Sequence, residues 1–287
     1  MWFSLYSDRP GRTHMWLPSL VRQWASSYAN ELTINPPPVA HSVSLAPTSS
    51  FSRILIGDPL FKIQQKLGQL VELCREYQQG VPEYMGRIAA QFCQNFIRPA
   101  KDPTVLSGDF GDENTMMTSA VEGHRTLLII TLLYSKHMLA SYYGRLDTAE
   151  RISSKLKKQM RGGPTTSPGF AIIHTFHEGL VAAARGRHDK KPNLRLARKR
   201  LRSLRATVLL CPENFMHKAH LLEAEILVGE GRLDDAMCSY DRGMCSSCRI
   251  FIRRANDLEL PDLYFSLVHS YQVRQQERFC ERRGLGE

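Results

Sequence analysis

A short sequence that occurs twice limits the fold of this chain more than any other feature. The segment from Gly144 to Ala149 (GRLDTA) returns from Gly231 to Ala236 (GRLDDA), and Gly186 lies between them. The three glycines are 42 and 45 residues apart. This period is typical of stacked two-helix units, in which glycine permits the turn and a small alanine allows close packing. The pattern predicts an all-α fold of stacked antiparallel helix pairs, a tetratricopeptide-like α-solenoid.

Apolar residues recur with helical spacing through the middle of the chain. One stripe predicts a helix from Asp58 to Gly80, with Asp58 as the capping residue and Pro59 in the first turn. A second helix is expected after Pro82, ending at Pro99, and a third from 127 to 143. Residues 101–113 are polar and predict a loop. Hairpin turns of the Asn-Gly or Asp-Gly type are missing between alternating segments, so no strands are expected.

Composition divides the chain into three segments. Residues 1–57 contain a triple proline and a Ser/Thr-rich run without helical or strand period, and we expect a poorly ordered lead-in. The helical repeat domain is expected over 58–250, and a terminal helix over 251–287.

Several classes of protein conflict with the composition. The longest apolar stretch, 126–134, is shorter than the roughly 20 residues that a membrane helix needs, and the first residues do not resemble a secretory signal. Seven cysteines in a chain of 287 residues are not needed as disulfides, and most are expected to be reduced and buried. We therefore expect a cytoplasmic protein, with the nucleus as the alternative.

The net charge of +10 is concentrated in one segment. From Arg151 to Arg205 the chain holds 15 Lys and Arg against two acidic residues. Inside it, a predicted amphipathic helix places Ala197, Leu201 and Leu204 on one face. Its cations form a candidate partner-binding patch: Arg195, Arg198, Lys199, Arg200, Arg202 and Arg205. Two interpretations are open: a solvated outer face, or a surface for an acidic partner, a nuclear import receptor or nucleic acid.

The sequence lacks the common motifs for catalysis and metal binding. The sequence has no phosphate-binding loop and no kinase-type H-R-D with a later D-F-G, so no catalytic residue and no cofactor is assigned. His174 with His177, like the pair at 217 and 220, is spaced i, i+3 and lacks the arrangement of a zinc protease helix, which favours structural or surface histidines. Cys245 and Cys248 form a single C-x-x-C without a second pair, which favours incidental thiols.

Three groups of residues resemble a known family. The groups are 91–95; then 102–103 with 106–110 and 112–113; and finally 211–218, continued at 221–225, 231–232, 236–237 and 240–242. In order and approximate spacing they resemble the long helical region of large multidomain signalling proteins that join an AAA-like ATPase to sensor and histidine-kinase modules. The resemblance covers residues 58–245 and none of the enzymatic modules.

The resemblance implies structural roles within the third group: Pro212, Asn214, Phe215, His217, Lys218, Glu223 and Tyr240. We expect Asn214, Phe215 and Leu222 to lock the third helix pair onto its neighbour, with Phe215 as a core anchor. Met244 to Cys248 departs from the small-residue helix end of the family, so a divergent or truncated end is expected.

These observations predict a non-catalytic helical-repeat scaffold or protein-interaction segment of a signal-transduction protein. Its expected partners are other proteins or adjoining signalling domains rather than a membrane or nucleic acid, and it is not expected to be an enzyme. The alternative hypothesis is a basic nucleic-acid-binding or nuclear adaptor module that uses the helix from Arg195 to Arg205.

Overall fold

The computed structural model describes residues 50–51, 53–54, 59–160, 168–209 and 211–255. Within these residues the chain forms nine named helices and no strand, which confirms the predicted all-α fold; Gly108 and Gly111 form an isolated bridge. The helices are α3 (Leu60–Glu76), α4 (Gly80–Ile97), α5 (Glu113–Glu122), α6 (Thr126–Tyr142), α7 (Leu146–Met160), α8 (Pro168–Gly186), α9 (Lys190–Val208), α10 (Pro212–Glu230) and α11 (Leu233–Ala255).

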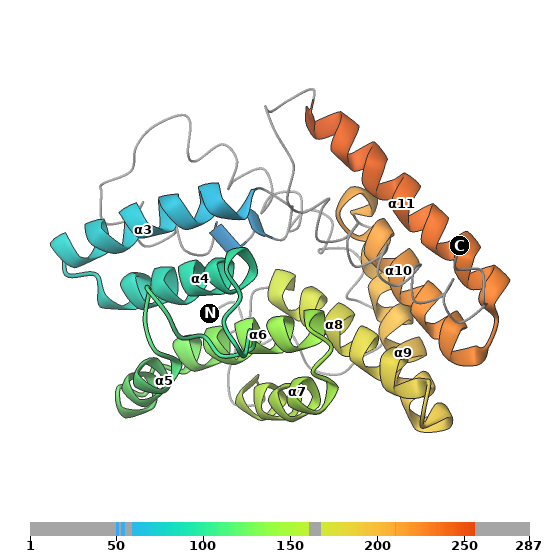
Figure 1. Cartoon of the computed structure of the whole chain (residues 1–287), viewed down its shortest axis with the longest axis horizontal. Helices are drawn as coiled ribbons and strands as arrows, with labels where there is room; N and C mark the ends of the chain where they lie inside the picture. Colours follow the sequence, from blue (N-terminus) through green and yellow to red (C-terminus); the bar gives the residue numbers. More distant parts are fainter. Residues whose placement is uncertain (1–49, 52, 55–58, 161–167, 210, 256–287) are drawn as a thin grey trace, which may run out of the picture.

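Consecutive helices pack in pairs, as expected for an α-solenoid. The most extensive contacts join α3 with α4, α6 with α7, α8 with α9, and α10 with α11. The first helices of the last three pairs also contact one another in succession, α6 with α8 and α8 with α10. In Figure 1, α5 and α7 lie along the lower edge of the molecule, and α9 rises from the lower right beside α10. The arrangement is α-solenoid-like.

The repeated sequence forms the same turn twice. Gly144 and Gly231 both adopt left-handed backbone conformations, with φ of 68° and 81°. In each turn, the residue after the glycine donates its N–H to the carbonyl five residues earlier, at 2.8 Å in the first turn and 3.0 Å in the second. This is the Schellman arrangement, in which glycine avoids the strain of a Cβ. Ala149 and Ala236 then lie fully buried at helix contacts.

The middle glycine has a different role. The chain reverses directly after Gly186, between α8 and α9, but Gly186 is not among the described residues with positive φ. A Cβ at this position would lie 2.6 Å from Cδ2 of Leu194 in α9. Gly186 therefore permits close packing of α8 and α9 without adopting the left-handed conformation of the other two glycines.

Several boundaries differ from those expected. The first helix begins at Leu60, after Pro59, and ends at Glu76 instead of Gly80; Asp58 lies outside the described residues. The second begins at Gly80, before Pro82. The short helix α5 was not predicted, because its buried side is reduced to Met116 and Ala120.

Two large apolar clusters form most of the core, beside two small ones, and α8 contributes to both large clusters. The first is built mainly from α3, α4 and α6, with Ile173 from α8; the second joins α8 to α11 and includes Phe176. Phe51 and Ile54, within the segment expected as a lead-in, are buried in the first cluster. The described part of α11 continues to Ala255, and residues 256–287 lie outside the description.

Candidate functional site

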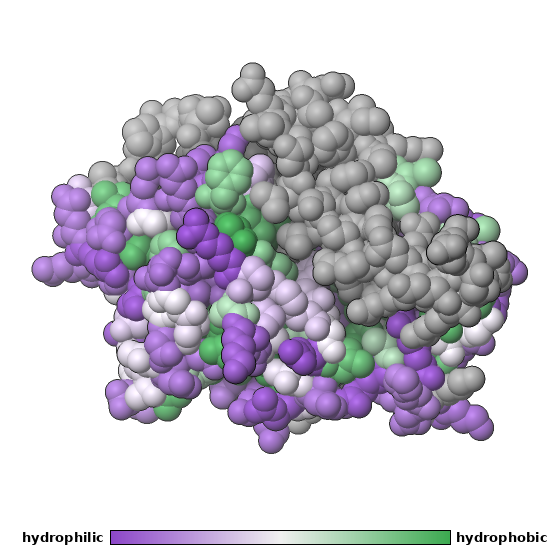
Figure 2. Space-filling view, viewed as in Figure 1, coloured by the Kyte–Doolittle hydropathy of each residue, from purple (hydrophilic) through white to green (hydrophobic). Residues whose placement is uncertain are grey.

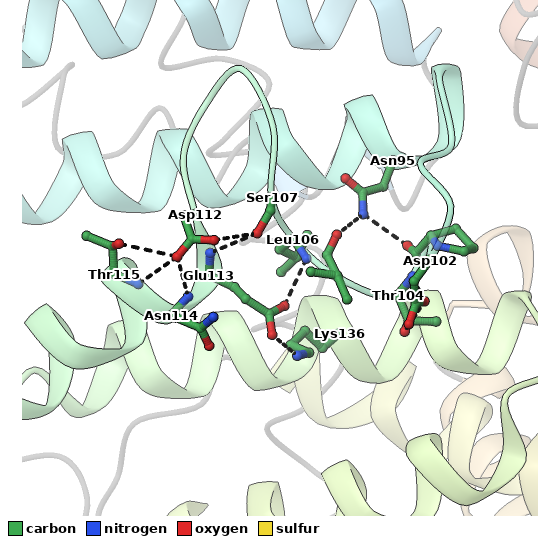
Figure 3. Close-up of polar contacts among 12 residues, drawn as sticks. Asn95, Asp102, Thr104, Leu106, Ser107, Asp112, Glu113, Asn114, Thr115 and Lys136 are labelled. Carbon is green, nitrogen blue, oxygen red and sulfur yellow. Dashed lines mark hydrogen bonds and ion pairs between the residues drawn. The ribbon is translucent and has the colours of Figure 1, made fainter.

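Side-chain amides hold the loop between α4 and α5 (Figure 3). Asn95, buried in α4, donates its Nδ2 to the carbonyl oxygens of Pro103 and Val105, at 2.9 and 2.6 Å. Its Oδ1 accepts from Nε2 of Gln91 at 2.8 Å, and Oε1 of Gln91 accepts the N–H of Phe110 at 3.2 Å. These bonds satisfy backbone groups that have no helix or strand partner.

Carboxylates tie the far end of the same loop to α5 and α6. Asp112 caps α5, and its Oδ1 accepts two N–H groups of the first turn at 3.0 Å each. Glu113 accepts the N–H of Leu106 at 2.9 Å with one oxygen and pairs with Lys136 of α6 through the other. The first two groups of the family resemblance therefore hold this loop in place. Their described side chains take part in its hydrogen bonds and ion pair, and we assign no catalytic site to them.

The third group of the resemblance forms the start of α10. Pro212 is the first residue of the helix, and Nδ2 of Asn214 donates to Sγ of Cys211 at 3.0 Å. His217 and Lys218 are buried, with Nε2 and Nζ 2.8 Å apart. His217 thus lies in the interior, in agreement with the packing role expected for it.

Later residues of this group connect α10 to its neighbours. Glu223 pairs with Arg205 of α9 at 2.7 Å. The hydroxyl of Tyr240 in α11 donates to Oε1 of Glu225 at 2.6 Å, and Glu225 also pairs with Arg187, just after α8. These contacts fit the structural roles that the resemblance implies.

Phe215 and Leu222 were both expected to anchor α10, and they differ in how deeply they are buried. Leu222 is fully buried, and a Cβ added at Gly179 of α8 would lie 2.7 Å from its Cδ2, so the two helices approach closely there. Phe215 packs against both apolar clusters but is only partly buried. Leu222 is therefore the core anchor, and Phe215 bridges the clusters from a partly exposed position.

The six cations of the candidate patch do not form one surface. Arg198 pairs with Glu230 and Arg205 with Glu223, at 2.7 Å each, so both connect α9 to α10. Arg200 faces the other side of α9 and pairs with Glu178 of α8. The remaining three are exposed and have no ion pair with any described residue: Arg195, Lys199 and Arg202. Half of the six cations therefore join helices of this chain, and the other half remain a candidate surface for a partner.

Glu178 connects three helices. One carboxylate oxygen accepts from Lys157 of α7, and the other lies 2.6 Å from Nε of Arg200 in α9. Burial alone would raise the pKa of the Glu178 carboxyl, but the hydrogen bond from Lys157 and the charge of Arg200 outweigh it and lower the pKa. The ionised carboxylate thus fixes α7 and α9 relative to α8.

Three histidine rings meet in the interior between α6 and α8, tilted or edge to face. The ring centroids of His137 and His174 are 4.9 Å apart, and those of His137 and His177 are 6.3 Å apart. His174 contacts Ser153 and His177 contacts Ser141, at 3.2 and 3.1 Å, whereas neither nitrogen of His137 has a hydrogen-bond partner among the described residues. Burial lowers the pKa of His174 to about 4, that of His177 to about 3, and that of His137 well below its usual value. All three are neutral at pH 7.

The histidine cluster does not have the geometry of a metal site. Among the described residues, no three His, Cys, Asp or Glu side chains are placed to hold a metal ion. Lys157 and Lys218 lie near enough to lower the histidine pKa values, and the same charges oppose a bound cation. His137 and Lys157 were not predicted as part of a site. For His137 the signal in the sequence was a polar residue inside the apolar segment that forms α6, whereas Lys157 is one of several cations of α7.

Five cysteines have described side chains, and no disulfide joins any of them. Cys74 and Cys93 are buried, as expected, and Cys211 is partly buried. Cys238 and Cys245 are exposed, so the expectation of burial is wrong for them. The side chain of Cys248 lies outside the described residues, and with it the C-x-x-C pair.

Comparisons with protein-family models, curated proteins and solved structures found no match for this chain. The family resemblance therefore rests on the residues quoted for it. In the part of the chain that the structure describes, no helix is long and apolar enough to cross a membrane.

Proposed function

We propose that this chain is a non-catalytic helical-repeat scaffold, a protein-interaction segment of a signal-transduction protein. The observation that supports it best is that the residues of the family resemblance make contacts between helices and hold a loop. From Gln91 to Glu113 they hold a loop, and from Pro212 to Tyr240 they join α10 to α8, α9 and α11. Residues that fix helices to one another suit a protein whose task is to hold partners in place.

Two measurements test this proposal. Proximity labelling with the full chain in its own cells is expected to mark proteins that contain ATPase or histidine-kinase modules above a matched helical-repeat control. Purified full chain is expected not to hydrolyse ATP above a blank. Labelling of metabolic enzymes alone, or ATP turnover that persists through repurification, would contradict the proposal.

One observation favours the second candidate, a basic nucleic-acid-binding module. Arg195, Lys199 and Arg202 are exposed without ion pairs to described residues and could meet phosphates. Binding of duplex DNA whose affinity falls steeply with salt, with a slope that decreases when these three residues are replaced by Gln, would support this candidate over the scaffold.

A further inference from the structure

The cations of α7 form an exposed stripe that the sequence did not single out. Arg151, Lys155 and Lys158 are spaced i, i+4, i+7, so they share one face of the helix. All three are exposed, and none forms an ion pair with a described residue. The two acidic side chains near the start of α7, Asp147 and Glu150, both pair with Arg185 of α8.

A second stripe follows α9. Lys191, Arg195, Lys199 and Arg202 are exposed and lie on the face opposite to the buried side of the helix. Like the cations of α7, they have no ion pair with a described residue. This stripe excludes the three arginines that connect α9 to α8 and α10.

The two stripes lie on helices that are held in fixed positions relative to each other. Glu178 binds Lys157 of α7 and Arg200 of α9 with its two oxygens, which fixes the helices relative to each other. In Figure 1, α7 lies along the lower edge of the molecule and α9 begins at the lower right, where the visible surface in Figure 2 is mostly hydrophilic. Seven cations that have no ion pair with a described residue therefore lie on two helices that Glu178 holds in place.

Two further features indicate what this surface binds. Leu209 is 85% exposed and lies seven residues after Arg202, on the same face of α9. Neither α7 nor α9 contains a Phe, Tyr or Trp on which a base could stack. A phosphate backbone gains nothing from an exposed leucine, whereas a protein segment gains from burying an apolar side chain against it.

We propose that α7 and α9 form a docking surface for an acidic protein segment that has an apolar residue near one end, which contacts Leu209. The proposal rests on the proposed function as an interaction segment and names the surface and the chemistry of its partner. From Lys191 to Leu209 the α9 stripe spans about 27 Å, which an acidic segment covers with about 18 residues as a helix or about 8 residues as a strand.

The test uses the full chain and a fluorescein-labelled synthetic peptide of about 18 residues, rich in Glu and Ala with two Leu at one end. A second peptide has Ser in place of both Leu, and a labelled DNA duplex of similar net charge is the third probe. Fluorescence anisotropy measures the affinity of each, and circular dichroism verifies that every variant is folded.

Four variants separate the parts of the surface. The α9 variant is Arg195→Glu, Lys199→Glu, Arg202→Glu; the α7 variant is Arg151→Glu, Lys155→Glu, Lys158→Glu; the third is Leu209→Ser. The matched control reverses three exposed cations that lie outside α7 and α9: Lys66→Glu, Arg98→Glu, Lys101→Glu. It changes the net charge by the same amount as either triple variant.

We expect each surface triple variant to weaken binding of the Leu peptide about tenfold, and the control to change it less than about twofold. Leu209→Ser is expected to weaken the Leu peptide about threefold and to leave the Ser peptide unchanged. Equal losses in the control, or tighter binding of DNA than of the Leu peptide together with no effect of Leu209→Ser, would overturn the proposal. If the variants do not weaken peptide binding but proximity labelling still finds signalling proteins, only the docking surface is rejected. If the variants weaken peptide binding as expected but no signalling proteins are labelled, only the signalling role is rejected.

Discussion

The N-terminal helices, α3 to α6, and the C-terminal helices, α8 to α11, are held together by different means. In the first region aromatic rings meet edge to face, as Phe96 does with Phe92 and Tyr142, and Asn95 holds a long loop. In the second region ion pairs join successive helices, and glycines allow close contact. The region after the first turn of the repeat thus combines glycine contacts with charged connections, whereas the region before it depends on aromatic packing and amides.

The largest expected effect is the loss of stability in mild acid at the junction of the two regions. The depressed pKa values of His137, His174 and His177 mean that the unfolded chain binds protons below pH 6.5 that the folded chain does not. Their contribution is fully present above pH 6.5 and is lost as the pH falls toward 4. With three such groups, the free energy of unfolding should fall by about 4 kcal/mol per pH unit in that window. Urea unfolding at several pH values measures this slope.

His137→Leu provides the control for the acid effect. It removes one of the three protons and leaves no side chain without a hydrogen bond, because neither nitrogen of His137 has a partner among the described residues. The slope should decrease by about one third. An unchanged slope would show that other groups cause the acid sensitivity.

Glu178→Ala is expected to destabilise the C-terminal region strongly. It leaves Lys157 and Arg200 without their shared carboxylate, and because Glu178 is buried while both cations are partly exposed, the loss should cost about 2 to 3 kcal/mol. Glu223→Ala removes the partner of the more exposed Arg205 and should cost about 1 kcal/mol or less. Urea unfolding at pH 7 compares the two, and equal costs would argue against Glu178 as the connection between α7 and α9.

Leu222→Ala and Phe215→Ala test which residue anchors α10. Leu222 is fully buried against α8, so its truncation should cost about 3 kcal/mol. Phe215 is partly buried and should cost about 2 kcal/mol or less. Thermal melting of the two variants ranks them, and a lower melting temperature for Phe215→Ala would restore it as the main anchor.

The smallest effect is expected for the exposed cations of α9. Replacing Arg195, Lys199 and Arg202 by Gln should change the free energy of unfolding by about 0.5 kcal/mol or less, because they have no ion pair with described residues. Arg200→Gln alone should cost more than the triple change, since it removes a cation from Glu178. If the triple variant were the less stable, the division of α9 into inner and outer cations would be wrong.

The sequence predicted the helical fold better than it predicted the side-chain contacts between helices. The turns at Gly144 and Gly231 could be predicted because backbone conformation limits what can replace glycine there. The role of Gly186 could not, because it depends on Leu194 of the next helix. A single helix likewise shows which cations oppose its apolar face but not which acidic residues its neighbours present. Arg200 was therefore placed with Lys199, although the two face different surroundings.

The position of α8 has a consequence for attempts to divide the protein. The helix supplies Ile173 to one apolar cluster and Phe176 to the other, and Phe215 contacts both. A fragment that ends before α8 would expose the first cluster, and a fragment that begins after it would expose the second. We therefore expect neither half to be obtained as a well-folded monomer, and two fragments expressed separately should recover native helicity only when one of them contains α8 intact and the other is present to cover it.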